Sequence, residues 1–180
     1  MRSRVLIAAG LLAISILARP AFAQKVTKES VPGITNLARL ETTIACAGAI
    51  KADVAVPEIK KMGFVSIINL RESTEPGAEV EKEEAVANAA GLRYFHVPFN
   101  GVSPDPKAAD QFLSAITSKG AEPAFIHCSG GNRAATMWLI KRLVVDRWAV
   151  ERATEEAVAL GQTSPTLRQF ALDYAQSHKQ

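Results

Sequence analysis

One short segment, residues 124–135, constrains the fold of this 180-residue chain more than any other. Its first residues are apolar and typical of a strand, whereas the apolar spacing from Asn132 onward is typical of a helix. A turn over residues 129–132 must therefore connect a strand to a helix N-terminus. The segment predicts an α/β unit with Cys128 at the carboxyl end of its strand.

This turn has the composition of an anion-binding loop. Gly130 and Gly131 are expected to adopt positive φ, so that successive backbone N–H groups point inward toward the helix N-terminus. Together with Arg133, this positive field favours thiolate over thiol at Cys128, and a thiolate is a ready nucleophile. The predicted catalytic residues are Cys128 and Arg133. The predicted phosphate-binding residues are Ser129, Gly130, Gly131, Asn132 and Arg133.

A structural interpretation of the same segment stays open. Free cysteine is among the most buried residue types, so Cys128 could be a strand cysteine that only precedes a helix. His127 would then be a packed core residue. The ordered combination of strand, Gly-Gly turn, arginine and helix favours the functional interpretation.

The residues from His127 to Arg133, His-Cys-Ser-Gly-Gly-Asn-Arg, resemble the signature loop of the cysteine-dependent protein tyrosine and dual-specificity phosphatases. Gly131 matches that loop, but the distance from Cys128 to Arg133 is one residue shorter. The shorter spacing is similar to two relatives. One is the phosphatase-like domain associated with beta-lactamase-like hydrolases, and the other is the rhodanese sulfurtransferases, whose loop carries a persulfide.

Two further segments favour the phosphatase-like relative. Residues 65–72, Val-Ser-Ile-Ile-Asn-Leu-Arg-Glu, resemble a strand of the compact phosphatases, and residues 94–99 resemble the strand that leads into their general-acid loop. The resemblance covers the chain from about residue 34 to its end. It implies a single α/β domain with a mainly parallel central sheet flanked by helices.

The chain departs from the phosphatase pattern at two places. Asn100 and Gly101 stand where those families have an aspartate that protonates the leaving oxygen. Asp105 could replace it, but the competing prediction is a helix start with Ser103 as N-cap and Pro104 at the first helical position. Ala134 stands where a hydroxyl normally helps the thiolate leave, so hydrolysis of the intermediate is expected to be slow.

The resemblance implies a definite reaction. Cys128 attacks phosphorus, the loop amides and the Arg133 fork hold the phosphoryl oxygens, and water then cleaves the cysteinyl-phosphate. Without a general acid, aryl esters should react better than alkyl esters. The expected substrate is a phosphate ester or a phosphoprotein, with no metal and no cofactor, and the protein is expected to be a monomer. Arg71, at the end of its strand, could reach the same pocket, but an exposed strand-end arginine is the favoured interpretation.

The first 23 residues read as a secretory signal peptide. Arg2 and Arg4 precede an apolar run over residues 5–17, and an Ala-x-Ala site predicts cleavage after Ala23. This run is too short to cross a bilayer comfortably, so no membrane anchor is expected after cleavage, and the protein is expected in the periplasm or outside the cell. Residues 24–180 form the predicted phosphatase-like domain.

The basic charge belongs to this leader. The whole chain has a formal charge of +3, and without the leader's three arginines its 18 remaining Lys and Arg balance its 18 Asp and Glu. A neutral domain argues against a nucleic-acid surface. The four glutamates 79, 81, 83 and 84 are expected to form a solvated helix face.

Strand and helix patterns alternate along the rest of the chain. Short strands and a turn are expected within residues 34–47, and further strands over residues 65–70, 92–99 and 123–128. Helices are expected over residues 54–62, 78–90, 106–118, 132–145, 150–160 and 165–178.

The two cysteines suggest one more hypothesis. An exported chain can form a disulfide between Cys46 and Cys128, either as a structural link or as a reversible protection of the nucleophile. The sequence does not give the Cα separation that such a bond requires. Three functions therefore stay open, namely a phosphatase, a rhodanese-type sulfurtransferase and a non-catalytic phosphate-binding module.

Overall fold

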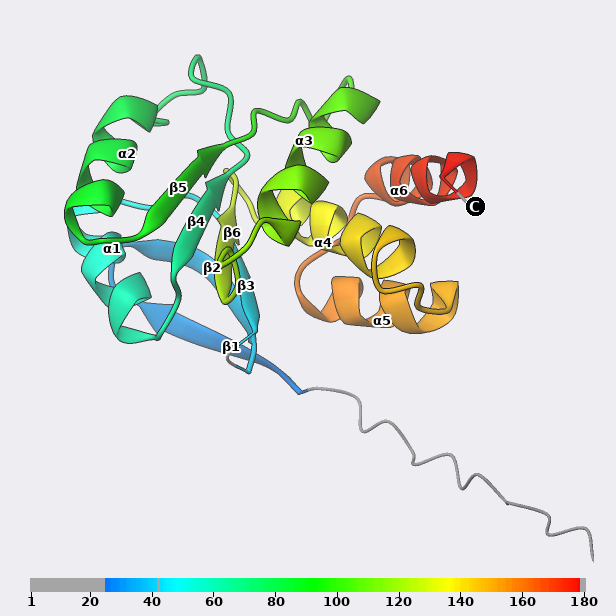
Figure 1. The fold of residues 1–180 in the computed structure, drawn as a ribbon, viewed down its shortest axis with the longest axis horizontal. Coiled ribbons are helices and arrows are strands. Elements are labelled where there is room, and N and C mark those ends of the chain that lie inside the picture. The colour runs from blue at the N-terminus through cyan, green and yellow to red at the C-terminus, as the bar shows by residue number, and fades with distance from the viewer. Residues whose placement is uncertain (1–24, 42, 179–180) are drawn as a thin grey trace, which may run out of the picture.

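The computed structural model describes residues 25–41 and 43–178, which form one six-stranded sheet with helices on both faces (Figure 1). The strand order is β1-β2-β3-β6-β4-β5. Strands β3, β6, β4 and β5 run parallel, whereas β1 and β2 add an antiparallel hairpin at one edge. The strands are β1 (Val26–Val31), β2 (Ile34–Leu40), β3 (Ile44–Ala47), β4 (Ser66–Asn69), β5 (Arg93–His96) and β6 (Ala124–His127).

Six helices of the described region cover the sheet. They are α1 (Ala52–Lys61), α2 (Val80–Ala89), α3 (Pro106–Thr117), α4 (Asn132–Val144), α5 (Val150–Ala159) and α6 (Pro165–Ser177). Helices α1 and α2 pack on one face, and the other four pack on the opposite face (Figure 1). This arrangement confirms the predicted single α/β domain.

The alternation of side chains along the strands divides the core into two layers. Ile67 and Phe125 lie in the cluster under α1 and α2, whereas Ile68 and Ile126 lie in the larger cluster under α3 to α6. Parallel strands covered on both faces are mostly apolar, and all four residues of each of β3, β4 and β6 are buried.

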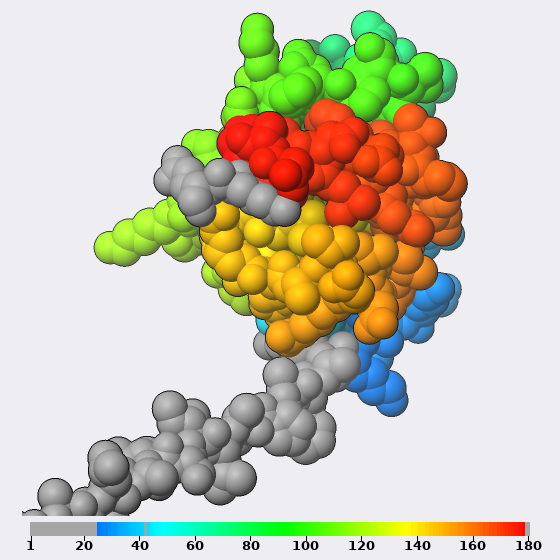
Figure 2. Space-filling view, turned by 90° about the vertical axis from the view of Figure 1, so that its right-hand side faces the viewer, coloured from blue at the N-terminus to red at the C-terminus, as the bar shows by residue number. Residues whose placement is uncertain are grey.

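Helix α4 is the central helix of the larger layer. Every residue from 133 to 143 is buried, because α3, α5 and α6 surround the helix on the sides that the sheet leaves open. Figure 2 shows α5 and α6 forming the outer face of this layer. The first turn of α4, which follows β6 directly, is therefore fixed from several sides.

Two predictions about secondary structure were wrong. Strand β1 was not expected, and it is held by pairing with β2 rather than by burial of its own residues, none of which is fully buried. Helix α3 begins at Pro106, as the predicted range 106–118 has it, but the residues predicted to cap it were wrong. Asp105 is its N-cap and accepts a bond from Lys107 N at 2.9 Å, and Pro106 follows it, in place of Ser103 and Pro104.

The predicted signal peptide, residues 1–23, lies outside the described residues. Within residues 25–41 and 43–178, no helix combines the length and the apolarity that crossing a membrane requires.

Candidate active site

The nucleophile candidate lies at the carboxyl end of β6, as predicted. Cys128 N donates to Ala47 O at 3.2 Å, and this bond continues the parallel pairing of β3 and β6 by one residue. The thiol is buried, with 1% of the residue exposed. Gly131 N donates to Cys128 Sγ at 3.1 Å, so a backbone amide of the loop already points at the sulfur.

The turn that follows needs glycine at one position only. Gly131 has φ of +100° and is the residue before α4, whereas Gly130 does not have a positive φ, contrary to the prediction for both. The outside of the loop is bound by neighbouring segments. Ala49 N donates to Ser129 O at 2.9 Å, and Asn36 Nδ2 donates to Gly130 O at 3.2 Å.

The inside of the loop offers unpaired donors. Within residues 25–41 and 43–178, no acceptor bonds the backbone N–H groups of Ser129, Gly130, Asn132 or Arg133. The last two belong to the first turn of α4, where the helix dipole adds partial positive charge. The predicted phosphate-binding residues therefore follow Cys128 in one turn whose unpaired backbone donors lie at a helix N-terminus.

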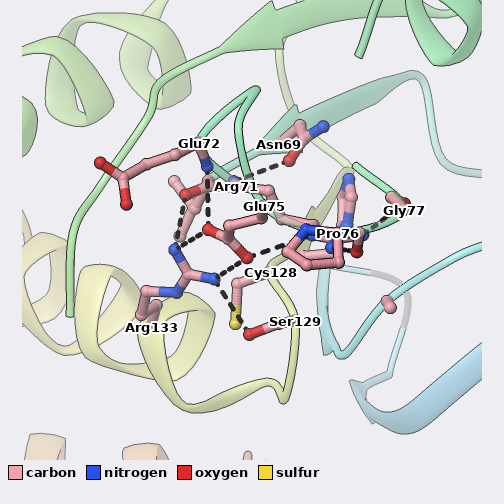
Figure 3. A network of polar contacts seen from close by, with 12 residues as sticks. Asn69, Arg71, Glu72, Glu75, Pro76, Gly77, Cys128, Ser129 and Arg133 are labelled. Carbon is pink, nitrogen blue, oxygen red and sulfur yellow. Dashed lines mark hydrogen bonds and ion pairs between the residues drawn. The ribbon is translucent and has the colours of Figure 1, made fainter. Parts of the chain in front are cut away.

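Arg133 projects from α4 across the loop and is 9% exposed. Its Nη1 donates to the carbonyl oxygens of Leu70 at 3.2 Å and Phe99 at 2.8 Å. Its Nη2 donates to Ser129 Oγ at 3.0 Å. Both terminal nitrogens also bind Glu75, at 2.6 Å and 2.8 Å (Figure 3). Burial alone would lower the pKa of Arg133, but its pairing with Glu75 and its proximity to Cys128 raise it.

Glu75 was not predicted as a site residue. Burial would raise the pKa of this carboxyl, but its hydrogen bonds and charge pairing with Arg133 and Arg71 hold the pKa at about 2. A bidentate carboxylate thus occupies the arginine fork to which a phosphoryl group would bind. The sequence signal was the position of Glu75 in the loop after β4, at the carboxyl edge where parallel sheets bind ligands.

Arg71 fixes this loop and is not the exposed strand-end residue that was predicted. It is 5% exposed and donates to Pro76 O at 2.7 Å and to Gly77 O at 2.8 Å. Its Nε also lies 3.3 Å from a Glu75 carboxylate oxygen. The three contacts hold the turn around Pro76 and, with it, the Glu75 side chain (Figure 3).

Asn100 stands at the position that the resemblance assigns to the general acid, and its side-chain amide is hydrogen-bonded within its own loop and to Glu72. Asn100 Oδ1 accepts bonds from Val102 N at 2.8 Å and Ser103 N at 3.0 Å, and Asn100 Nδ2 donates to Glu72 Oε2 at 3.0 Å. Asp105, the alternative acid, is engaged in capping α3. Neither side chain hydrogen-bonds to the nucleophile loop within the described part of the chain.

A buried polar group lies directly before the nucleophile. His127 is fully buried, and its Nε2 lies 2.8 Å from Glu83 Oε1. Glu83 is 2% exposed, so the prediction that it lies on a solvated helix face was wrong. Asn69 Nδ2 lies 3.4 Å from the other Glu83 oxygen and donates to Tyr94 Oη at 2.9 Å. The pairing explains why a helix facing the core contains a carboxylate.

Both cysteines are free thiols, and both are buried. Cys46 pairs with Ile126 in the parallel register of β3 and β6, so Cys128 lies two residues further along the neighbouring strand. The strand spacing and rise make such a diagonal Cα separation about 8 Å, which is beyond the usual range for a disulfide. Burial, and then the proximity of Cys128, raise the pKa of the Cys46 thiol. The structure thus argues against the proposed disulfide.

Comparison with known protein families matches residues 36–144 to the phosphatase-like domain of the beta-lactamase hydrolase-like proteins. The chain belongs to this family. The matched region begins within β2 and ends with α4, so it includes both the nucleophile loop and the Glu75 loop.

One relative is a beta-lactamase hydrolase-like protein from Agrobacterium fabrum, 37% identical over 89 residues. The match covers 47% of this chain and 20% of that protein, so this chain spans about a fifth of the length of the relative.

Two solved structures share the fold. A DUF442 protein from Shewanella putrefaciens CN-32 superposes with a TM-score of 0.67 at 16% identity, over 82% of this chain and 96% of the other. P. aeruginosa TpbA superposes with a TM-score of 0.62 at 20% identity, over 89% and 94% of the two chains.

Proposed function

We propose that this protein is a cysteine-dependent phosphatase that hydrolyses aryl phosphate monoesters through a cysteinyl-phosphate intermediate. The observation that supports this most strongly is the convergence of three groups on one point. These groups are the Cys128 thiol, the unpaired amides of the loop and the guanidinium of Arg133. A family relationship to phosphatase-like domains points in the same direction. So does a solved structure of P. aeruginosa TpbA, with the same fold, in complex with phosphotyrosine.

The chemistry divides between the nucleophile and the donors. The Cys128 thiolate attacks phosphorus, an S–P bond forms and the ester P–O bond breaks; water later cleaves the S–P bond and releases phosphate. The loop amides and Arg133 stabilise the charge on the phosphoryl oxygens. Arg133 Nη1 keeps its bonds to the carbonyls of Leu70 and Phe99, while both terminal nitrogens release the Glu75 carboxylate and a phosphoryl oxygen takes its place at Nη2.

Turnover of p-nitrophenyl phosphate by the purified full-length protein under reducing conditions tests the proposal. Cys128→Ser and Arg133→Ala should lose phosphate release, whereas Cys46→Ser should keep it. Retained activity in Cys128→Ser would contradict the proposed mechanism. Loss in both site variants with an active Cys46→Ser would support it.

A sulfurtransferase is the second candidate. Four residues separate Cys128 from Arg133, as in the short loop of rhodaneses, and the amide of Asn100 offers no proton to an ester leaving group. Transfer of sulfur to Cys128 would not need that proton. Thiosulfate-to-cyanide transfer measured in parallel distinguishes the two reactions, and absence of both activities would leave a phosphate-binding module.

The proposed function includes export. We infer cleavage after Ala23 and a periplasmic or secreted, monomeric protein that acts on a phosphate ester or phosphoprotein and does not bind nucleic acid. Sequencing the N-terminus of the protein from the periplasmic fraction tests this. A first residue of Gln24 supports export, and an intact Met1 in the cytoplasmic fraction contradicts it.

A further inference from the structure

Ester hydrolysis leaves one requirement that neither Asn100 nor Asp105 meets. The oxygen that leaves phosphorus must receive a proton unless its own pKa is low, and positioned proton transfer is worth about 10²- to 10⁴-fold in rate. Two other carboxylates lie at this edge of the sheet, Glu72 and Glu75, both in the loop between β4 and α2. Their contacts differ.

Glu72 is directed toward the loop after β5. Its Oε2 accepts the bond from Asn100 Nδ2, and its backbone N donates to Glu75. Within residues 25–41 and 43–178, no bond joins the Glu72 side chain to Arg133 or to the nucleophile loop. Figure 3 shows its carboxylate pointing away from Cys128.

Glu75 instead lies at the nucleophile loop. Its Oε2 is 2.8 Å from Arg133 Nη2, the same nitrogen that donates to Ser129 Oγ. Its side chain is 19% exposed, so it remains open to solvent on one side. Arg71 donates to the carbonyl oxygens of Pro76 and Gly77, the two residues that follow Glu75, and its Nε lies 3.3 Å from Glu75 Oε2, so a second arginine also holds this carboxylate.

Substrate binding changes the charge around this carboxylate. In the free protein, the Glu75 carboxylate forms an ion pair with the Arg133 guanidinium. A phosphate monoester dianion that binds the Arg133 guanidinium removes this partner, leaves Arg71 Nε, 3.3 Å from Glu75 Oε2, as the remaining cation, and adds two negative charges beside Glu75 and the Cys128 thiolate. Like charges at such distances favour the protonated carboxyl, so binding is coupled to proton uptake by Glu75.

Building on the proposed phosphatase function, we propose that Glu75 is the general acid of the reaction, in place of the aspartate that the loop after β5 lacks. The Glu75 carboxyl gives its proton to the ester oxygen as the P–O bond breaks and the S–P bond forms, and becomes a carboxylate. In the second step this carboxylate takes a proton from the water that attacks phosphorus. The S–P bond electrons return to Cys128, which leaves as thiolate.

A pair of substrates separates acid catalysis from positioning. p-Nitrophenolate is a good leaving group at neutral pH and departs without being protonated, whereas phenolate needs a proton as it departs. Glu75→Gln, which keeps a hydrogen-bond acceptor for Arg133, should lower kcat/KM for phenyl phosphate by about 10²- to 10⁴-fold and for p-nitrophenyl phosphate by less than about tenfold. Glu72→Gln, the matched control three residues away, should affect both substrates little and equally.

The pH profile gives a second readout. Wild-type kcat for phenyl phosphate should fall at high pH as the Glu75 carboxyl in the complex loses its proton. The kcat of Glu75→Gln should not show this fall at high pH. Glu75→Asp should recover part of the rate. Equal losses on both substrates, or no loss on either, would overturn the role of Glu75. A wild-type protein inactive on both substrates would instead contradict the proposed phosphatase function itself.

Discussion

The nucleophile loop and the loop after β5 lie at the same edge of the sheet, but they differ in what they supply to the proposed phosphatase site. The nucleophile loop is built mainly from backbone: one glycine with positive φ, free amides and a helix N-terminus. The loop after β5 would contribute a single side chain, and its residue, Asn100, is tied into hydrogen bonds with its own loop and with Glu72. Backbone donors depend little on the identity of the side chains in a loop, whereas a proton donor depends on one side chain.

The largest effect should come from the nucleophile. Cys128→Ser is expected to lower phosphate release by at least about 10³-fold, because the hydroxyl is a far weaker nucleophile without an adjacent base. Cys46→Ser removes the other buried thiol and should retain most of the activity. Steady-state rates with p-nitrophenyl phosphate measure both. Equal losses would mean that the pair of thiols, and not Cys128 alone, supports the reaction.

The next largest loss of activity should come from substitution of Arg133. Arg133→Ala is expected to lower kcat by about 10²- to 10³-fold, as loss of a transition-state donor usually does. Arg133→Lys keeps the charge without two parallel donors, so it should recover little of the activity. Inhibition by vanadate gives an independent measure of anion binding. Full activity in Arg133→Lys would show that charge alone suffices.

The two glycines of the loop provide a matched pair for the backbone. Gly131→Ala should destabilise the protein by about 1–2 kcal/mol, because a Cβ at φ of +100° is strained although its nearest contact is a tolerable 3.6 Å. Gly130→Ala meets no atom within 4 Å and should cost less than about 0.5 kcal/mol. Denaturant unfolding measures the difference, and equal costs would contradict the assigned roles.

The smallest effect concerns the pairing of Glu75 in the free protein. Its pKa of about 2 lies below the ordinary value of 4.5, so its contribution to stability is complete above about pH 4.5 and lost as the pH falls toward 2. Glu75→Gln should therefore cost about 1 kcal/mol at pH 7 and progressively less below pH 4.5. Glu72→Gln is the control for removing a carboxylate from this loop. A cost that does not change with pH would contradict the ion pair.

Local patterns predicted the parts of this fold that they determine. The apolar strands β4 and β6, the helix after the nucleophile and the loop around Cys128 follow from periodicity, glycine and the strand-to-helix change. Strand β1 was not predicted because none of its residues is fully buried and its sequence has no core pattern. Its pairing with β2 defines it.

The site residues that the sequence did not predict are placed by contacts between residues far apart in the chain. Glu83 resembles its solvated neighbours in sequence, and only the packing of α2 against the sheet brings it to His127, 44 residues away. Glu75 and Arg133 are 58 residues apart and meet because β4 and β6 are adjacent parallel strands. Knowledge of the strand order was needed to see that their loops share one edge.

Trapping the covalent intermediate tests the central claim most directly. The full-length protein would be mixed with p-nitrophenyl phosphate, quenched in acid and digested, and the peptide containing Cys128 examined by mass spectrometry. The account predicts one phosphoryl group on Cys128 in the wild-type protein and none on this peptide in Arg133→Ala. A peptide that stays unmodified during turnover, or that acquires sulfur from thiosulfate and never phosphate, would contradict it.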